Sequence, residues 1–327
     1  METPEVMQIF ERLIGSVWTF SALSYAAEKG ILEQLDEPRT LSYVSEHTKV
    51  PIALVERILD ILIAVNLVQR EGDTYTADKG LLPFITPPRK AFFLGNLKSN
   101  YFEIRNLIDS AKESETEPGW SFTEPEILQS MGRAAFRLGD SIFREVVPSL
   151  GDLASQLQKP SAKFLDVGTG MGGIAIVACS FLPNLHAVGL EPQDAPLTEA
   201  RQNITTAGLA DRIELRKERV EDMTDQEVFD LVYFPQAFMS DDVVKLGLRN
   251  IWKALRPSGW VIVQTIAVPG MELPAALSQL RDTLMGGDAR IPSQVEAMLS
   301  DAGFTSISTI PSSIVATFNF VAGQRLA

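Results

Sequence analysis

The stretch that decides the fold reads Phe164-Leu165-Asp166-Val167-Gly168-Thr169-Gly170-Met171-Gly172-Gly173. An apolar run ends in an acid and breaks into glycines, which predicts a strand, a tight turn and the start of a helix. Glycines let the backbone approach a ligand where a side chain would clash, and Asp166 stands where a strand-end carboxylate accepts hydrogen bonds from an amine or a ribose. The stretch therefore predicts a site for a nucleotide-like cofactor.

The same glycines fit two kinds of cofactor site. Gly168, Gly170 and Gly173 have the G-x-G-x-x-G spacing of dinucleotide-binding domains. Those domains most often carry this motif near the start of a doubly wound sheet, whereas here the N-terminal half of the chain precedes it. The acid two residues before the first glycine gives D-x-G-x-G instead. Position and acid together favour a cofactor other than a dinucleotide.

From Phe164 onward, short apolar runs alternate with helical patterns, which is typical of a parallel sheet in an α/β domain. The expected strands are Lys163–Val167, Leu185–Leu190, Ile213–Arg216, Phe229–Phe234 and Trp260–Ile266. Two further runs, Phe304–Ile310 and Ile314–Val321, are joined by only Pro311-Ser312-Ser313. So short a connection requires antiparallel pairing. The sequence predicts an α/β fold with a Rossmann-like seven-stranded sheet that ends in an antiparallel hairpin.

The N-terminal region is expected to be mainly helical. Val6 to Gly30 has helical spacing, and Thr40 is a plausible N-cap for a second helix. A third helix, Ile52 to Asn66, carries an apolar stripe made of Leu54, Val55, Ile58, Leu59, Leu62 and Val65. A hairpin follows, and this order is typical of a winged helix. We expect three parts, namely residues 1–88 (winged-helix-like), 89–158 (helical linker and pocket roof) and 159–327 (cofactor-binding domain).

Composition indicates which partners to expect. The chain has 327 residues, 45% of them hydrophobic, and a net charge of −13, which disfavours nucleic-acid and anionic-membrane binding and favours small-molecule partners. One cysteine, Cys179, excludes an intramolecular disulfide and a cysteine-based zinc cluster, and we predict no metal site. We see no signal peptide and no apolar run of about 18 residues, so we expect a cytoplasmic protein.

Residues 160–322 resemble the class I S-adenosylmethionine-dependent methyltransferases. Besides the glycine stretch, the matching segments are Val188–Glu191, Ala207–Leu209, Phe229–Val232, Ala254–Trp260 and Asp301–Phe304, in the order of that family. The N-terminal part resembles the winged-helix dimerisation domain of small-molecule O-methyltransferases, through Gly30, Thr40, Arg57–Leu62 and Gln69–Thr76. The resemblance implies S-adenosyl-L-methionine as cofactor, a homodimer and a role in secondary metabolism.

The resemblance also implies which residues contact the cofactor. Asp166 and the glycine turn would hold its methionine end, and Glu191 would bind both ribose hydroxyls. For the adenine, either Asp222 reaches the amine or Val220 contributes backbone and apolar contact alone. The full expected set is Asp166, Gly168, Thr169, Gly170, Glu191, Pro192, Val220, Asp222 and Pro235.

The expected catalytic region departs from the resembled family. Plant-like O-methyltransferases carry a base histidine after the fourth strand, and Ala237 stands in that place here. Gln236 is the polar candidate, and Asp241 is either a base or a helix cap. Without a histidine, the acceptors that fit best are a carboxylate, an acidic phenol or an enol.

The resemblance also implies that the helices before the sheet roof the substrate pocket, as they do in the resembled family. Arg133 and Arg137 are spaced i, i+4 and would suit an anionic substrate, or they are ordinary surface arginines. The expected substrate-binding set is Met131, Arg133, Phe136, Arg137, Phe238 and Met239.

Two alternatives to methyl transfer stay open. One is a non-methylating reaction assisted by the bound sulfonium, namely cyclisation, elimination or decarboxylation. The other is a winged-helix DNA-binding regulator. It is disfavoured because the presumptive recognition helix Ile52 to Asn66 contains only Arg57 as a basic residue.

Overall fold

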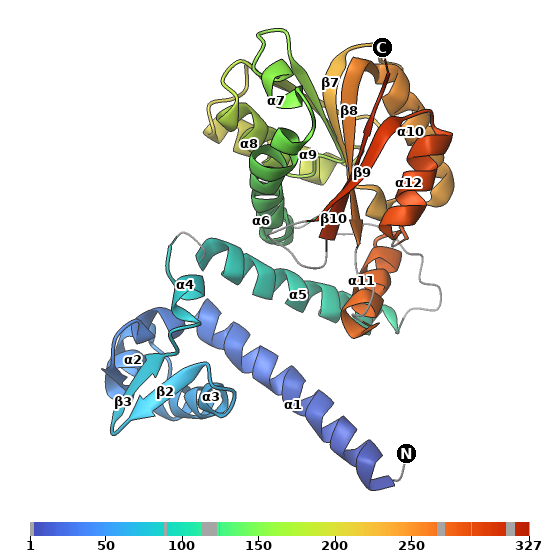
Figure 1. Ribbon diagram of the computed structural model, residues 1–327. Coiled ribbons are helices and arrows are strands. Elements are labelled where there is room, and N and C mark those ends of the chain that lie inside the picture. The colour runs from blue at the N-terminus through green and yellow to red at the C-terminus, as the bar shows by residue number, and fades with distance from the viewer. Residues whose placement is uncertain are drawn as a thin grey trace. The chain divides into compact units, whose positions relative to one another are not determined.

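The computed structural model describes residues 3–87, 90–112, 123, 125–266, 272–288, 290–311 and 318–326. It divides into two compact units, residues 1–101 and 102–327, which are described separately (Figure 1). Within the described ranges, we find no helix with the length and apolar character needed to cross a membrane.

The first unit has the predicted order of three helices and a hairpin. Its antiparallel sheet has the order β1-β3-β2. Thr40 caps the second helix as predicted, because its hydroxyl accepts a hydrogen bond from the Tyr43 amide at 3.3 Å. The elements are α1 (Thr3–Glu28), η1 (Leu32–Leu35), β1 (Arg39–Thr40), α2 (Leu41–Thr48), α3 (Ile52–Ala64), β2 (Val68–Glu71), β3 (Thr74–Ala77), α4 (Leu82–Ile85) and most of α5 (Lys90–Ser110).

The buried face of α3 is narrower than the apolar stripe of its sequence. Val55, Leu59 and Leu62 are buried, but Leu54 and Val65 are each 41% exposed. One packed face covers only part of a helix circumference, so positions at the stripe's edges stay at the surface. Leu54 and Val65 therefore extend the predicted apolar stripe beyond the buried face of α3.

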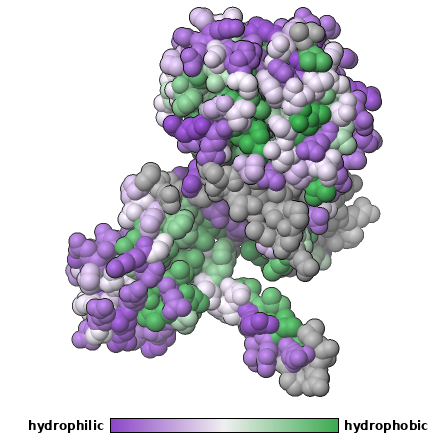
Figure 2. Space-filling model, in the orientation of Figure 1, coloured by the Kyte–Doolittle hydropathy of each residue, from purple (hydrophilic) through white to green (hydrophobic). Residues whose placement is uncertain are grey.

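Helix α1 exposes a row of large apolar side chains. Figure 2 shows green patches on this helix, which is the long blue helix of Figure 1. Val17 and Trp18 are 65% and 67% exposed. The residues of this α1 surface are Val6, Met7, Phe10, Leu13, Ile14, Val17 and Trp18.

The second unit is built on a seven-stranded sheet of order β6-β5-β4-β7-β8-β10-β9. The first five are parallel, and β10 runs antiparallel to both β8 and β9, which confirms the predicted fold class. The strands are β4 (Lys163–Val167), β5 (His186–Leu190), β6 (Ile213–Arg216), β7 (Phe229–Phe234), β8 (Leu255–Ile266), β9 (Thr305–Pro311) and β10 (Phe318–Gln324).

Four strands differ in their bounds from the prediction. β5 begins at His186 rather than Leu185. β8 begins at Leu255 rather than Trp260, because Leu255 already pairs with Phe229 before a register shift. β9 begins at Thr305 rather than Phe304 and ends one residue later than predicted. β10 runs to Gln324, beyond the predicted end at Val321, and residues 314–317 of the predicted strand lie outside the described residues.

Helices cover both faces of this sheet (Figure 1). Alternate strand residues point to opposite faces, so Phe164 packs with α8 while Leu165 packs with α10 and α12. The remaining elements are α6 (Pro125–Ser141), η2 (Ile142–Val146), η3 (Val147–Ser149), α7 (Leu153–Gln156), α8 (Gly173–Phe181), α9 (Asp194–Thr206), η4 (Gln236–Phe238), α10 (Asp241–Ala254), α11 (Glu272–Leu284) and α12 (Pro292–Asp301).

Cys179 lies on the buried side of α8, within the core. Its side chain is fully buried, and its sulfur lies 3.5 Å from the Leu185 carbonyl oxygen. Burial raises the pKa of this thiol to about 11, against the nearby Arg212 guanidinium. The chain's single cysteine is therefore a packing residue in its thiol form.

Helices α6 and α8 pack closely at glycines. A Cβ added to Gly139 would lie 2.9 Å from Val177 Cβ, and one added to Gly173 would lie 2.9 Å from Ala135 Cβ. At Gly132, an added Cβ would meet Met171 Cγ at 2.5 Å. These contacts bring α6 directly onto the glycine turn between β4 and α8.

Candidate cofactor site

The glycine turn connects β4 to α8 through left-handed backbone. Gly168 and Gly170 have φ of 62° and 54°, a conformation that strains any residue with a Cβ. The backbone therefore reverses sharply at the carboxyl end of β4, which in open α/β sheets is the edge where ligands bind.

Asp166 lies beneath this turn with one carboxylate oxygen unsatisfied. It is 1% exposed, and its Oδ2 accepts a hydrogen bond from the Thr169 hydroxyl at 2.7 Å. Its Oδ1 is buried and has no hydrogen-bond partner within the described part of the chain. Burial raises the pKa of Asp166 to about 7, against the Thr169 hydrogen bond, and the charge of Glu191 adds to this rise. Such an oxygen is suited to receive an ammonium or amide donor from a ligand.

Glu191 follows β5, which pairs directly with β4. Its Oε2 accepts a hydrogen bond from the Gly170 amide at 3.1 Å, and its Oε1 accepts one from the Gln193 amide at 3.0 Å. Burial raises the pKa of this carboxyl despite both hydrogen bonds. A carboxylate has about four acceptor positions, so ribose hydroxyls can be added to these two bonds.

A second group of polar side chains anchors the turn from neighbouring helices. Asn203 of α9 donates through Nδ2 to the Met171 carbonyl at 3.1 Å. Gln129 of α6 donates to the Glu199 carboxylate at 2.6 Å. Sequence reasoning missed these residues, because isolated amides on amphipathic helices carry no motif and are usually at the surface.

The two predicted prolines lie in different environments. Pro192, after Glu191, is exposed, whereas Pro235 is buried after β7. A Cβ added to Gly168 would lie 3.6 Å from Pro235 Cγ. Pro235 and the glycine turn are therefore neighbours at the carboxyl edge of the sheet.

The two candidates for the adenine also differ. Val220 is 3% exposed, and its side chain packs in the core with residues of α10, close to Gly247. Asn250 donates to the Val220 carbonyl at 3.2 Å, while Asp222 lies exposed nearby. The Val220 side chain is thus committed to the core, and the Asp222 carboxylate is accessible from solvent.

The loop after β7 is held by a buried arginine that sequence reasoning missed. Arg290, 3% exposed, donates to Gln236 Oε1 at 2.6 Å and to Asp241 Oδ1 at 2.6 Å. It also donates to the Met239 carbonyl at 3.2 Å. Gln236 in turn donates to the Gln264 carbonyl at 3.1 Å. Both predicted catalytic candidates, Gln236 and Asp241, therefore belong to one network centred on Arg290.

This network determines what Asp241 can do. The hydrogen bond and charge of Arg290 hold the pKa of Asp241 below its usual range, and Lys245 acts in the same direction. A carboxylate stabilised in this way is a weaker proton acceptor. The geometry favours a loop-holding role for Asp241 at the start of α10.

The predicted substrate residues lie on α6 and on the loop after β7. Arg133 is exposed, Arg137 is half-buried and Phe136 packs against the core beside Gly173. The side chain of Met131 lies outside the described ones. Phe238 is 47% exposed, and Met239 is half-buried against the α10 side of the core. Sequence reasoning missed an apolar cluster beside them, formed by Leu128, Met171 and Met285.

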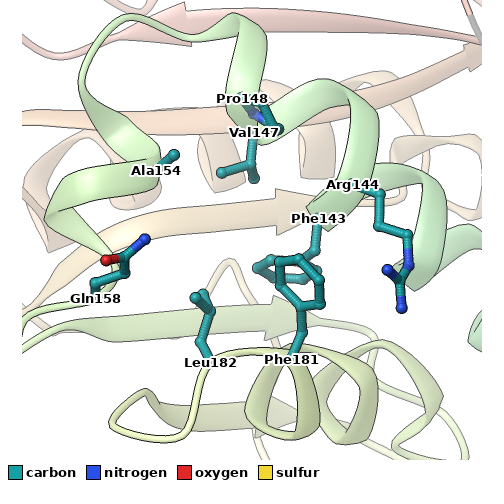
Figure 3. Close-up of a pocket in the computed structure, with 8 residues that line it drawn as sticks. All are labelled: Phe143, Arg144, Val147, Pro148, Ala154, Gln158, Phe181 and Leu182. Atoms are coloured by element: carbon teal, nitrogen blue, oxygen red, sulfur yellow. The ribbon is translucent and has the colours of Figure 1, made fainter.

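A separate cavity of about 390 Å³ lies at the other end of α8. Figure 3 shows Phe143, Phe181 and Leu182 around it, with Arg144 at one side. The glycine turn precedes the first residue of α8, whereas Phe181 is its last. This cavity is therefore distinct from the candidate cofactor site.

Comparisons with known proteins agree with this geometry. Residues 158–303 match the family model described as "Methyltransferase domain". The release factor glutamine methyltransferase of Cereibacter sphaeroides is 27% identical over 165 residues, which is 49% of this chain and 59% of that protein. The chain thus spans less than two thirds of the length of this curated relative.

Solved structures share the fold along the whole chain. An O-methyltransferase family protein from Burkholderia thailandensis superposes with a TM-score of 0.76 at 15% identity, covering 100% of this chain and 99% of that one. Human N-acetylserotonin methyltransferase, solved in complex with S-adenosylmethionine, gives a TM-score of 0.74 at 17% identity and covers 100% of both chains.

The residues at the turn fit the cofactor of that family. The unsatisfied Asp166 Oδ1, the left-handed glycines and the Glu191 carboxylate form a polar edge that can receive an amino acid and a ribose. Residues 158–303 therefore match a methyltransferase domain, and the acceptors at the glycine turn fit S-adenosylmethionine.

Proposed function

We propose that this protein is an S-adenosylmethionine-dependent methyltransferase acting on a small molecule, and that it methylates an oxygen of a carboxylate, phenol or enol. One observation carries the proposal. Asp166, buried with an oxygen that has no hydrogen-bond partner among the described residues, and Glu191 flank the left-handed glycine turn at the ends of paired parallel strands. This arrangement offers acceptors to the amino-acid and ribose parts of one ligand.

Within this proposal each residue has a stated task. The methionine end contacts Asp166 and the turn of Gly168, Thr169 and Gly170, and the ribose contacts Glu191 beside Pro192. Asp222 or the backbone of Val220 meets the adenine, and Pro235 bounds the site next to Gly168. When bound, the cofactor supplies a methyl group activated by a sulfonium.

Binding of S-adenosylhomocysteine by calorimetry tests this proposal. We expect Asp166→Asn and Glu191→Gln each to weaken binding at least about tenfold, because each removes an ionised acceptor, and hydrogen bonds to charged groups contribute about 1.5–3 kcal/mol. Asp211→Asn, an exposed carboxylate before β6, is the matched control and should bind normally. Unchanged affinity in both site variants would contradict the placement of the cofactor.

A substrate with negative charge is the second part of the proposal. Arg133 and Arg137 lie on α6, the helix that packs on the glycine turn. We propose that they attract an anionic acceptor, and that Phe238 and Met239, after β7, contact its apolar part with Met131 and Phe136 of α6.

The non-methylating alternative keeps the same cofactor site. Ala237 stands where the resembled family has its base, and Asp241 is ion-paired with Arg290. These features also suit a reaction that uses the sulfonium only as a positive charge. Accumulation of S-adenosylhomocysteine with turnover supports methyl transfer, and turnover without it supports the alternative.

We further propose that the first unit forms a homodimer. The α1 surface defined above and the exposed edge of α3 are apolar, as expected of an interface between copies. Arg57, the basic residue of α3, is ion-paired with Asp60 at 2.6 Å and Glu56 at 2.9 Å, which leaves little charge for DNA phosphates.

A further inference from the structure

The end of α11 packs directly on the position where the resembled family has its base. A Cβ added to Gly287 would lie 1.7 Å from the Ala237 carbonyl oxygen and 2.8 Å from the Met239 amide. Two backbones that approach so closely leave no room for any side chain at Gly287. The turn after α11 therefore lies against the loop that begins at the carboxyl end of β7.

Asp282 is tied to this turn by its own backbone. The Asp282 carbonyl accepts a hydrogen bond from the Gly287 amide at 2.9 Å and another from the Met285 amide at 3.1 Å. Residues 282 to 287 thus form one closed turn at the end of α11. Asp282 is placed within this turn, which also touches Ala237.

Asp282 lies three residues before Met285, the residue of this segment that packs near the glycine turn. Met285, three residues later, still has helical hydrogen bonding, because its amide donates to the Arg281 carbonyl at 3.1 Å. It packs with Leu128 of α6 and with Met171 of the glycine turn. Helix positions i and i+3 share a face, so Asp282 is directed to the same side.

The charged groups described near Asp282 form no hydrogen bond to its Oδ2 atom. Its Oδ2 is buried and lacks a hydrogen-bond partner in the parts of the chain that the structure describes. Two cations are close, but Arg281 binds Glu103 of α5 at 2.5 and 2.8 Å, and Arg290 binds Asp241 and Gln236. Neither guanidinium is therefore directed at Asp282.

These surroundings raise the pKa of Asp282 into the neutral range. Burial raises the pKa of Asp282 to about 7. Arg281 and Arg290 oppose the rise, while Asp288 and Glu103 add to it. A base whose pKa is close to the working pH combines an available ionised form with a useful affinity for the proton.

We propose that Asp282 is the general base of this enzyme, taking the place of the histidine that Ala237 replaces. This inference rests on the proposed methyltransferase function. The substrate's hydroxyl proton passes to Asp282 Oδ2 as the oxygen–carbon bond forms and the carbon–sulfur bond breaks. The products are the methyl ether of that hydroxyl, the neutral thioether and a protonated Asp282, which then releases its proton to solvent.

Methyl acceptors of different acidity show whether Asp282 acts as a base or only supports the structure. We compare methyl transfer to 4-methylphenol, which must lose its proton in the reaction, with transfer to 4-nitrophenol, which is already ionised in mildly alkaline buffer. Asp282→Asn should lower turnover of 4-methylphenol about 100-fold, the lower end of general-base contributions, but that of 4-nitrophenol less than about tenfold. Equal losses with both acceptors, or no loss with either, would overturn the proposal.

A matched control and a direct titration complete the test. Asp288→Asn also removes one negative charge, from an exposed residue directly after the turn. This variant should retain turnover while the pKa of Asp282 shifts downward. Carboxyl carbon NMR of aspartate-labelled protein should show a resonance that titrates near neutral pH and is missing from Asp282→Asn. Its absence from the wild type would also overturn the proposal.

Measuring S-adenosylhomocysteine binding distinguishes a failure of this inference from a failure of the proposed function. Asp282→Asn should bind S-adenosylhomocysteine with unchanged affinity, because the cofactor contacts assigned above lie on β4, β5 and their loops. If the wild-type protein fails to bind S-adenosylhomocysteine, the proposed function fails. If binding is intact in both proteins and the acceptor pattern is absent, only the role of Asp282 fails.

Discussion

A buried carboxyl group without a full set of partners costs stability when it ionises, and Asp166 is in this position. Its pKa is about 7 in the folded chain, against an ordinary value of 3.8. Because the folded state holds the proton more tightly than the unfolded state, the cost is absent below about pH 4 and grows until the pH passes 7. Ligand-free Asp166→Asn should therefore melt at a higher temperature than wild type at pH 8.5, and with a much smaller difference at pH 5.

Differential scanning calorimetry of both proteins at the two pH values measures this effect. A shift of several degrees is expected, since about 1 kcal/mol corresponds to roughly 2–4 °C in a domain of this size. An equal difference at both pH values would indicate that Asp166 is ionised and satisfied in the free protein.

Arg290 is the residue on which the loop after β7 depends. Arg290→Met should lower the free energy of unfolding by about 3 kcal/mol, because Gln236 would remain buried without its partner. Urea unfolding measures this loss. The control is Arg249→Met on α10, where the arginine is exposed and the change should stay within about 0.5 kcal/mol.

The conservative variant separates charge from geometry. Arg290→Lys retains the positive charge but loses the planar fork that reaches Gln236 and Asp241 together, so it should recover only part of the stability. Full recovery would show that charge alone holds the loop.

At the scale of single residues, local motifs predicted the site residues that lie at the ends of strands. They missed the residues that distant segments of the chain contribute. Asp166 lies near the end of β4 and Glu191 directly follows β5 in a recognisable pattern, and both lie at the predicted edge of the sheet. Arg290 and Asp282 come from a region with no motif, and they reach the site because α11 packs onto the loop after β7. Such contacts join residues about 50 positions apart, as with Arg290 and Asp241, and a single sequence does not reveal them.

At the scale of elements, the contact between the α11 turn and the β7 loop is the most sensitive point. Gly287→Ala places a methyl group where only 1.7 Å separates it from the Ala237 carbonyl oxygen, so one of the two backbones must move. A displacement of about 1 Å can reduce a reaction rate about 100-fold. We expect turnover to fall by that order while S-adenosylhomocysteine affinity stays unchanged.

Steady-state kinetics and calorimetry on the same preparation check both halves of this expectation. The control is Gly15→Ala in α1, where nothing lies within 4 Å of the added Cβ. Normal turnover in Gly287→Ala would mean that the turn adapts without disturbing the site.

The bounds of an element were predicted well where that element is a single short apolar run. β4, β6 and β7 have the predicted bounds, because each is a short apolar run fixed by parallel neighbours. β8 was predicted too short, since Pro257 and Gly259 interrupt its first part and a register shift separates the Leu255 pair from the Trp260 pair. The apolar stripe of α3 was predicted, but periodicity does not tell how much of such a stripe a neighbour covers, and its edges are exposed.

At the scale of the whole molecule, the α1 surface predicts assembly. Trp18→Asp, at a position 67% exposed in the single chain, should convert a dimer to a monomer. Sedimentation velocity measures the change. Glu11→Gln, on the same helix, is exposed and should leave the dimer intact. A wild-type protein that sediments as a monomer at micromolar concentration would contradict the assembly.

Reaction of the buried Cys179 thiol can report when the α8 layer separates from the sheet. With a pKa of about 11 and no exposed surface, it should react with a disulfide reagent only when the α8 layer transiently separates from the sheet. Because the chain has one cysteine, every labelled molecule records an event at this place. Saturating S-adenosylhomocysteine should slow labelling under conditions where opening is at equilibrium, and the ratio of rates would measure how firmly a ligand at the glycine turn closes the helix that begins there.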